Sequence, residues 1–558
     1  MIECISAFIL KYILLCIKYN NIINIILKMG IPSYFSYIVK NHSNIIRKFD
    51  SKSIRVNNLY LDCNSIIYDA VRSIDFTKLT ESEVDTIIRA VFAKIDEYIS
   101  LLKPDQNVFI AFDGVAPVAK LDQQRSRRYK SLYQNNISKT IFKDTKPDPW
   151  NTTAITPGTL FMQKLNEKIR KNYNNPAKFN LTNLILSPSD KFGEGEHKLF
   201  EYIRAFPDQH VGKNTVIYGL DADLIMLSIC HLPISKDIYL FRETPEFIKS
   251  INAELEPNES YFMDIPELAK IITQNMNMNN EDYQNINRIY DYIFLCFFLG
   301  NDFMPHFPSI NIRTGGIDKM LNAYKATIGG SNEVLTDGKK INWKNVRKMV
   351  QYLADYEEDN YKKEAKLRDR RERSTIIADT PEELFKKFDS LPTQEREIEK
   401  YINPFKANWQ NRYYKSLFDI EIDDTRRNQI CTNYLEGLEW NMKYYASGCP
   451  DWKWCYNYSY PPLLGDLIKF IPYFDVEFIE NKKPQPVNEL VQLCYVLPKQ
   501  SLHLLPDKLN KALVKEHSNW HKNDCEFLWA YCRYFWEAHV LLPHIDINEL
   551  EQFVKINS

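Results

Sequence analysis

The sequence contains no Cys-x-x-Cys pair, although it has eleven cysteines among its 558 residues. Without such pairs a zinc knuckle has no ligand framework, and the odd number of cysteines argues against a disulfide scaffold. The chain also lacks an excess of charge of either sign, because its formal net charge is −1. Nucleic-acid binding therefore has to be judged from local patches. We expect reduced thiols and an intracellular, cytoplasmic protein.

Long uncharged apolar runs are also missing. Residues 1–28 are apolar, but Lys11 and Lys18 interrupt them and no small-residue cleavage site follows. No charge-free run reaches the roughly 18 residues that a membrane span needs. We interpret residues 1–28 as an extension upstream of a start at Met29 and expect no stable membrane association. A membrane or targeting segment is the alternative.

Residues 29–330 have the pattern of an α/β domain. Helical stretches such as 82–101 and 160–172 alternate with apolar, strand-like runs. Continuous apolar strands joined by helices predict a mostly parallel sheet that is covered on both faces. The strand-like runs are 58–67, 107–116, 181–187 and the beginning of 214–227.

The rest of the chain divides into two parts by composition. Residues 331–400 are charged and predict a helical linker, in which 356–373 is a solvated helix or, less simply, a nucleic-acid contact. Residues 401–558 predict a largely helical second region that is rich in aromatic side chains.

Acidic side chains follow several of the strand-like runs. In two of them the strand itself is expected to end at Asp62 and at Asp113, where parallel sheets form ligand sites. Two further segments, "LDAD" and "GEGEHK", have acid-x-acid spacing, which puts both side chains on one side of an extended backbone. Another acid closely follows the apolar run 292–299 and therefore needs a partner. The seven candidates are Asp62, Asp113, Glu194, Glu196, Asp221, Asp223 and Asp302.

Taken together these acids predict a metal site. A single acid at a strand end is usually a turn residue or a helix cap, but seven neighbouring carboxylates repel one another unless cations lie between them. Carboxylate oxygens suit Mg²⁺ or Mn²⁺. Two such ions about 4 Å apart stabilise the attacking and leaving oxygens of a phosphoryl transfer. We predict two Mg²⁺ ions, with Mn²⁺ as a substitute, and expect the glycines of "GEGEHK" to let the backbone approach them.

A basic helix is predicted directly after Asp113. Pro117 is suited to its first turn, and Lys120, Gln124, Arg127 and Arg128 then fall on one face. Such a face matches a terminal phosphate, because arginine offers a fork of donors and lysine a point charge. The alternative is a solvated basic face.

Aromatic residues are concentrated around Trp452 and Trp454 in "CPDWKWCYNYSY". Aromatic clusters are usually core, but an exposed ring also offers a stacking surface for any base. Cys449 and Cys455 stand nearby, and no second pair of cysteines completes a zinc site.

These motifs resemble one family, the XRN 5′-to-3′ exoribonucleases. In the first half the similar segments are "MGIPSYF" (29–35), "LYLDCNSII", "FDGVAPVAKLDQQRSRR", "ITPGTLFM" (155–162), "GEGEHK", "YGLDADLIML" and "FLGNDFMPH" (298–306). In the second half they are "NRYYKSLF", "YYASGCPDWKW" (444–454), "VLPKQSLHLLP" (496–506) and "LLPHID" (541–546). The resemblance spans residues 29–550.

The resemblance implies a fold and site residues. It implies a flap-endonuclease-like (PIN-like) α/β nuclease domain closed off by a helical second region. The seven acids above correspond to the family's metal ligands, and Lys120, Gln124, Arg127 and Arg128 correspond to its 5′-phosphate pocket, with Lys120 also reaching the scissile phosphate. A tryptophan, Trp452 or Trp454, would stack on the substrate.

The sequence departs from the family pattern at several points. Tyr68 stands where the family has a histidine that stacks on the terminal base, so stacking is retained but any imidazole chemistry is in doubt. The segment between "RRYK" and "ITPG" is short, which predicts a reduced projecting helix. We expect no accessory β domains of the kind that larger relatives carry, and hence no partner recruitment through them.

The function that follows is a Mg²⁺-dependent 5′-to-3′ exoribonuclease. We expect a monomer that degrades single-stranded RNA with a 5′-monophosphate and releases nucleoside 5′-monophosphates. Two alternatives remain open at this point, a structure-specific flap-type DNA nuclease and a catalytically inactive RNA-binding scaffold.

Overall fold

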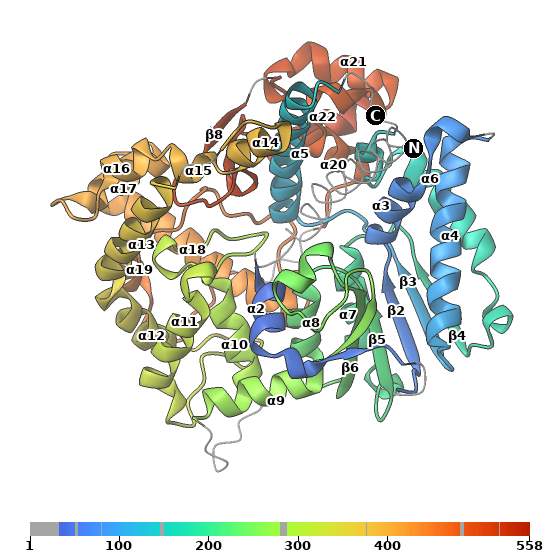
Figure 1. Cartoon of the computed structure of the whole chain (residues 1–558), viewed down its shortest axis with the longest axis horizontal. Helices are drawn as coiled ribbons and strands as arrows, with labels where there is room; N and C mark the ends of the chain where they lie inside the picture. Colours follow the sequence, from blue (N-terminus) through green and yellow to red (C-terminus); the bar gives the residue numbers. More distant parts are fainter. Residues whose placement is uncertain are drawn as a thin grey trace.

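The computed structural model describes residues 33–50, 54–79, 81–144, 150–278, 287–374, 377–479, 485–523 and 525–558 (Figure 1). The interpretation of residues 1–28 and of a start at Met29 lies outside these ranges. Within them, no helix is both long and apolar enough to cross a membrane.

A seven-stranded sheet forms the centre of the first half. Its strand order is β1-β7-β6-β5-β2-β3-β4. The five strands from β6 to β4 are parallel, and β7 and β1 add an antiparallel edge. This confirms the predicted mostly parallel sheet. The strands are β1 Ile46–Lys48, β2 Asn58–Asp62, β3 Asn107–Ala111, β4 Asn183–Ser187, β5 Asn214–Tyr218, β6 Asp237–Glu243 and β7 Ser260–Asp264.

Helices cover both faces of the sheet, because its strands are apolar on both sides. Leu59 and Leu61 pack into one buried cluster, while Tyr60 between them packs into the other. The first face carries α3 (Asn64–Ser73), α4 (Glu83–Leu102) and α6 (Leu160–Asn172), and the second carries α7 (Gly195–Ala205), α8 (Asp223–His231) and α9 (Ile265–Met276) (Figure 1).

The second half is largely helical, as predicted. Its apolar side chains join those of the sheet domain in one core that runs from Tyr34 to Ile479, so the proposed boundaries at residues 330 and 400 stay predictions. The helices outside the sheet layers are α2 Tyr34–Asn41, α10 Arg288–Phe297, α11 Gly316–Tyr324, α12 Trp343–Asp355, α13 Glu357–Glu372, α14 Pro381–Asp389, α15 Leu391–Gln394, α16 Glu397–Ile402, α17 Trp409–Phe418, α18 Asp424–Ala446, α19 Leu464–Phe470, α20 Glu489–Val496, α21 Asp507–Glu516 and α22 Ile547–Asn557. A short hairpin pairs β8 (Glu526–Leu528) with β9 (His539–Leu541).

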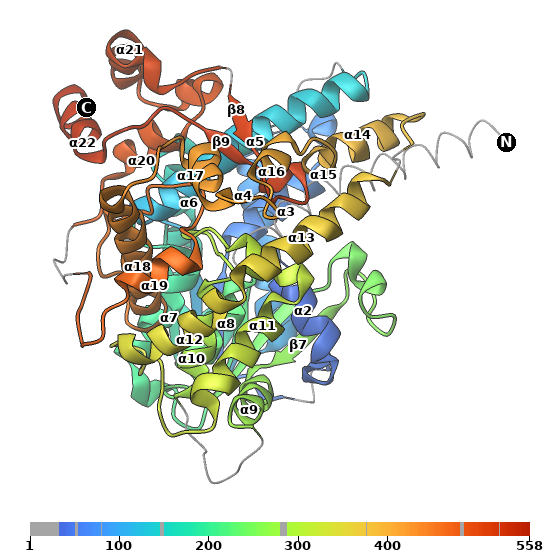
Figure 2. The same ribbon diagram turned by 90° about the vertical axis from the view of Figure 1, so that its left-hand side faces the viewer.

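One long helix connects the sheet domain to the second half. Helix α5 (Val118–Ile141) begins just after β3 and rises from the carboxyl edge of the sheet between α14 and the α20–α22 group (Figures 1 and 2). It contacts α14, α20 and β9. The basic face predicted for this helix therefore lies inside the molecule, between the two halves.

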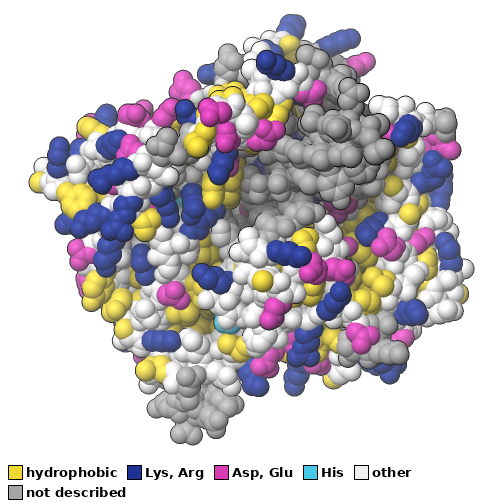
Figure 3. Space-filling model, viewed as in Figure 1, with side chains coloured by type: hydrophobic (Ala, Val, Ile, Leu, Met, Phe, Trp, Pro, Cys, Tyr) yellow, Lys and Arg dark blue, Asp and Glu magenta, His cyan; other side chains and the backbone are white. Residues whose placement is uncertain are grey.

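Helix α13 corrects the interpretation of residues 356–373 as a solvated helix. The helix is present, but Tyr361 and Arg368 on it are almost fully buried. Arg368 donates to both carboxylate oxygens of Glu399 at 2.6 and 2.7 Å. Only the opposite side faces solvent, and Lys and Arg side chains gather on the surface over this end of the molecule (Figure 3). Acidic and basic residues alternate along this helix. The sequence alone does not distinguish the arginines and glutamates that are buried as ion pairs from those that face solvent.

Candidate active site

Acidic side chains converge at the carboxyl edge of the sheet. Asp62 ends β2 and Asp113 follows β3, and because these strands are parallel neighbours the two carboxylates meet. Helices α7 and α8 begin at the same edge and bring two acids each, and the loop after α10 adds Asp302. The electrostatic coupling among these groups links all seven predicted carboxylates into one cluster.

The acid-x-acid pairs reach the cluster through helix starts and not through extended strands. Strand β5 ends at Tyr218, and Asp223 is already the first residue of α8. The carboxylate of Asp221 accepts a hydrogen bond from the backbone N–H of Asp223 at 3.0 Å. The expectation of an extended backbone under this pair is therefore wrong. Negative charge is favourable at both positions because the amino-terminal end of a helix carries partial positive charge.

The "GEGEHK" segment is shaped by its second glycine. Gly195 donates its backbone N–H to Asp113 at 2.6 Å. A Cβ at this position would lie 2.5 Å from Asp62 Oδ1 and 3.3 Å from Asp113 Oδ1. Only glycine lets the start of α7 approach two carboxylates this closely. The predicted approach of the glycines to metal ions stays a prediction.

Burial raises the pKa of most carboxyl groups in the cluster, so that their ionised forms are disfavoured in the absence of cations. It raises the pKa of Asp221 to about 6, with a further contribution from the Asp302 carboxylate. Burial and neighbouring carboxylates raise the pKa of Asp62, Glu196 and Asp223 well above the ordinary range, and that of Asp113 is raised as well. The cause is the same in each case, because a low dielectric and like charges both disfavour the carboxylate form.

Lys120 supplies a positive charge inside the cluster. Its ammonium lies 2.6 Å from Glu194 Oε2 and 2.7 Å from Asp302 Oδ2, and its side chain is almost fully buried. Burial alone would lower the pKa of Lys120, but the carboxylates of Asp302 and Glu194 raise it well above its ordinary value. Lys120 therefore stays charged, and it is one ammonium among seven carboxylates.

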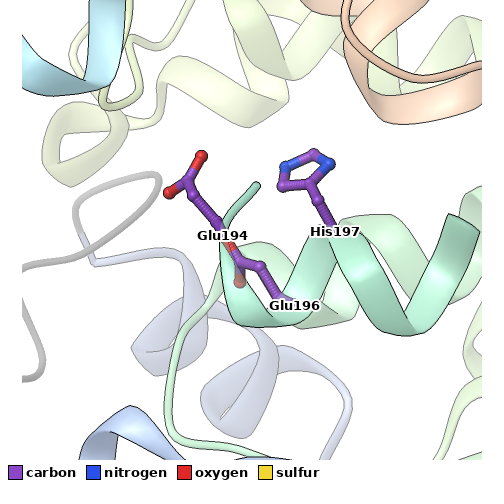
Figure 4. A group of neighbouring side chains, drawn as sticks. All are labelled: Glu194, Glu196 and His197. Atoms are coloured by element: carbon purple, nitrogen blue, oxygen red, sulfur yellow. The ribbon is translucent and has the colours of Figure 1, made fainter. Parts of the chain in front are cut away.

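The second half of the chain also contributes to the site. From the last turn of α18, Tyr444 donates its hydroxyl to Glu194 Oε1 at 2.7 Å. Its ring stacks on His197 at 3.8 Å between centroids. One oxygen atom each of Glu194 and Glu196 and a ring nitrogen of His197 lie within 4.8 Å of one another, and Figure 4 shows the three side chains at the start of α7.

The predicted basic face of α5 divides into two directions. Arg128 donates to Thr156 Oγ1 at 2.6 Å. Tyr68 on α3 lies close enough to Arg128 to contribute to its pKa, which it raises against the larger effect of burial. Arg127 instead lines a large cavity on another side of α5. Gln124 is half-buried between these directions. Burial lowers the pKa of Arg128 to about 10. Its Nη1 is buried and has no hydrogen-bond partner among the described residues, so this guanidinium can donate to an anionic partner.

The two tryptophans of the aromatic block have different surroundings. Trp454 is buried, stacks on Trp440 at 5.2 Å and donates to Glu436. Trp452 is half-buried, and its backbone carbonyl accepts the N–H of Val118 at the start of α5. Because one ring face of Trp454 is already covered, Trp452 is the better of the two candidates for base stacking.

Two family models match most of this chain. The model described as the XRN 5′-3′ exonuclease N-terminus matches residues 29–244, and the model described as the Xrn1 helical domain matches residues 282–400 and 386–557. The chain belongs to the XRN family of 5′-to-3′ exonucleases. The enzyme class predicted from the sequence, a 5′-3′ exoribonuclease, is confirmed with the family.

Individual relatives agree with this assignment. The 5′-3′ exoribonuclease 2 homolog of Drosophila melanogaster is 26% identical over 94% of this chain and 70% of its own length. The 5′-3′ exoribonuclease 1 of Saccharomyces cerevisiae is 28% identical over 94% of this chain and 43% of its own length. Among solved structures, the catalytic core of Rad2 in complex with DNA substrate is 14% identical, with a TM-score of 0.31 over 63% of this chain and 81% of that chain.

The acidic cluster of this XRN chain fits divalent cations. One oxygen each of Asp62, Glu196 and Asp223 is buried and has no hydrogen-bond partner among the described residues. Buried polar atoms without partners are rare in proteins. Hard cations suit them, because every donor in the acid set is a carboxylate oxygen.

Three residues of the XRN site were not singled out from sequence. Lys198 is buried and donates to the carbonyls of Phe112 and Pro188 at 2.7 and 3.0 Å, which ties α7 to the ends of β3 and β4. Asn64 donates to Asp113 at 2.5 Å, and Tyr444 holds Glu194. All three lie inside the motifs that carried the resemblance, but their contacts depend on tertiary structure that spacing does not reveal.

Proposed function

We propose that this protein is a Mg²⁺-dependent 5′-to-3′ exoribonuclease that acts on single-stranded RNA with a 5′-monophosphate and releases nucleoside 5′-monophosphates. The observation that carries the proposal is the buried cluster of seven carboxylates around one lysine at the edge of a parallel sheet. Two Mg²⁺ ions, when bound, would supply charge stabilisation for the attacking and leaving oxygens of phosphodiester hydrolysis. Their ligands would be Asp62, Asp113, Glu194, Glu196, Asp221, Asp223 and Asp302.

The protein groups around the cluster would orient the RNA. Lys120, held between Glu194 and Asp302, would place its ammonium against the scissile phosphate. Arg128 and Thr156 would bind the 5′-phosphate, since a guanidinium fork and a hydroxyl match a terminal phosphate. Gln124 and Arg127 complete this pocket in the proposal.

Aromatic side chains would hold the bases without reading them. Tyr68 stands next to Arg128, and Trp452 is anchored at the start of α5. Rings in these positions would stack on the first bases regardless of sequence, which suits an enzyme that removes every nucleotide in turn.

A side-by-side degradation assay tests the proposal. Single-stranded RNA with a 5′-monophosphate and a 5′-flap DNA are incubated with the full chain in Mg²⁺ and in EDTA. We expect mononucleotides from the RNA in Mg²⁺ alone. Flap cleavage without RNA degradation would replace the proposal by a DNA nuclease, and RNA binding without any degradation would replace it by an inactive scaffold.

A further inference from the structure

A cavity of about 800 Å³ lies beside α5, between the two halves of the chain. Its walls come from α5, from the loop after α10 and from the segment that includes β9. Gln123, Arg127, Lys130 and Ser131 of α5 line it, whereas Arg128 on the same helix does not. The cavity therefore opens to a different side of α5 from the proposed contacts of the 5′-phosphate with Arg128.

The cavity begins where the carboxylate cluster ends. Asp302 belongs to both, because it lines the cavity and is also bound by Lys120 at 2.7 Å. Gln123 Nε2 donates to the other oxygen of Asp302 at 3.2 Å. Asp302 and Gln123 therefore lie at the boundary between the carboxylate cluster and the cavity.

The lining combines cationic, acidic and aromatic side chains. Lys130 donates to the carbonyl of Ala538 at 2.7 Å, and burial lowers its pKa to about 8. Arg313 lies over the rings of Tyr534 and Trp536, at 5.7 and 5.6 Å from their centroids. The lining also includes Arg125, Arg127 and Lys453 and four acids, Asp122, Asp302, Glu537 and Asp546. Of these acids, Glu537 pairs with Arg313 at 2.5 Å. The volume is within the roughly 300–1,000 Å³ of ordinary ligand sites.

A product of 5′-to-3′ hydrolysis needs a route of its own. After cleavage the remaining strand still fills the path along which it arrived, so the released nucleotide has to leave on another side. We propose that the cavity beside α5 is the exit site for the released nucleoside 5′-monophosphate. Its phosphate contacts would be Lys130 and Arg127, and Arg127 is also part of the proposed 5′-phosphate pocket, from which the product would pass into the cavity. This inference rests on the proposed exoribonuclease activity.

Narrowing the cavity tests the inference. Ser131→Trp and Gln134→Trp each put a large ring into its α5 wall, and neither residue belongs to the proposed catalytic groups. Asn135→Trp is the matched control, because residue 135 is exposed on the same helix and does not line the cavity. Thermal unfolding selects the variants that keep the fold. Rapid-quench measurements on a short 5′-monophosphate RNA then separate the first cleavage from the steady-state rate.

An exit site predicts slow release after normal chemistry. In Ser131→Trp or Gln134→Trp the first cleavage should stay within about twofold of the parent, while the steady-state rate falls at least about fivefold and a burst of product appears. Added adenosine 5′-monophosphate should also inhibit these variants less than the parent or Asn135→Trp. Loss of the first cleavage in a folded variant would mean that the cavity holds the substrate, and unchanged rates in both variants would mean that product leaves elsewhere; either result overturns the inference. Absence of cleavage in the parent would instead refute the proposed function.

Discussion

At the scale of single residues, the proposed activity depends most directly on the acids of the cluster. Asp221→Asn or Glu194→Gln should lower cleavage at least about a hundredfold, because each removes a proposed cation ligand. RNA binding should persist, since α5 keeps its basic side chains. Asp208→Asn, at an exposed position, is the control. Near-normal turnover of either variant in Mg²⁺ would contradict the assignment of these ligands.

Arg128 is the residue that should read the end of the RNA. Arg128→Ala should reduce the preference for a 5′-monophosphate over a 5′-hydroxyl by about 1.5–3 kcal/mol, the value of one charge-assisted hydrogen bond. The comparison uses kcat/KM on the two RNAs. Arg89→Ala, on the outer side of α4, should leave the ratio unchanged. Arg125 is a poor control, because it is buried and donates to the carbonyls of Pro543 and Trp520.

At the scale of elements, α13 depends on ion pairs that are buried. Glu399 accepts from Arg368, Arg396 and the backbone N–H of Tyr531. Glu399→Gln should lower the free energy of unfolding by about 3–5 kcal/mol, since it leaves two arginines without their shared buried partner. Denaturant unfolding measures the change, and the exposed Glu397→Gln should be nearly neutral. An equally small effect of both variants would show that α13 is held by its apolar contacts alone.

The start of α13 should make stability depend on pH. Glu357 accepts the backbone N–H groups of Leu464 and Gly465 at the start of α19, and burial raises its pKa from 4.5 to about 7. The folded state therefore binds a proton that the unfolded state has lost, so stability from this group is full below pH 4.5 and disappears as the pH rises through 7.

Replacing Glu357 tests this dependence. The contribution of Glu357 amounts to about 3 kcal/mol between the two limits, and Glu357→Gln should flatten the decline of the melting temperature across that window. Glu358→Gln, next to it but exposed and paired with Lys362, should not. A parent protein whose decline matches that of Glu357→Gln would contradict the assignment.

The elements also show how far the sequence leads. Apolar runs and their spacing predict β2, β3, β4 and β5 and the helices between them, because burial on both faces leaves a continuous pattern. The antiparallel edge of β7 and β1 was not predicted, and β1 in particular has three residues and no periodicity to detect. The buried side of α13 was misinterpreted because the sequence does not show whether a charged residue forms a buried ion pair or faces solvent.

At the scale of the whole molecule, the site belongs to both halves of the chain. Tyr444 from α18 binds Glu194, and Trp452 binds the start of α5 through its carbonyl. The seven acids could be predicted because strand ends and motif spacing place them at one edge of a sheet. The cavity beside α5 could not, because its walls come from segments separated by more than 400 residues and meet only after folding.

The central claim is that the molecule degrades RNA from a 5′-phosphorylated end. The most direct measurement compares three forms of one RNA in Mg²⁺: with a 5′-monophosphate, with a 5′-hydroxyl, and closed into a circle. The account predicts rapid release of nucleoside 5′-monophosphates from the first, much slower release from the second and none from the circle. Equal rates on the two linear RNAs, or cleavage of the circle, would contradict it.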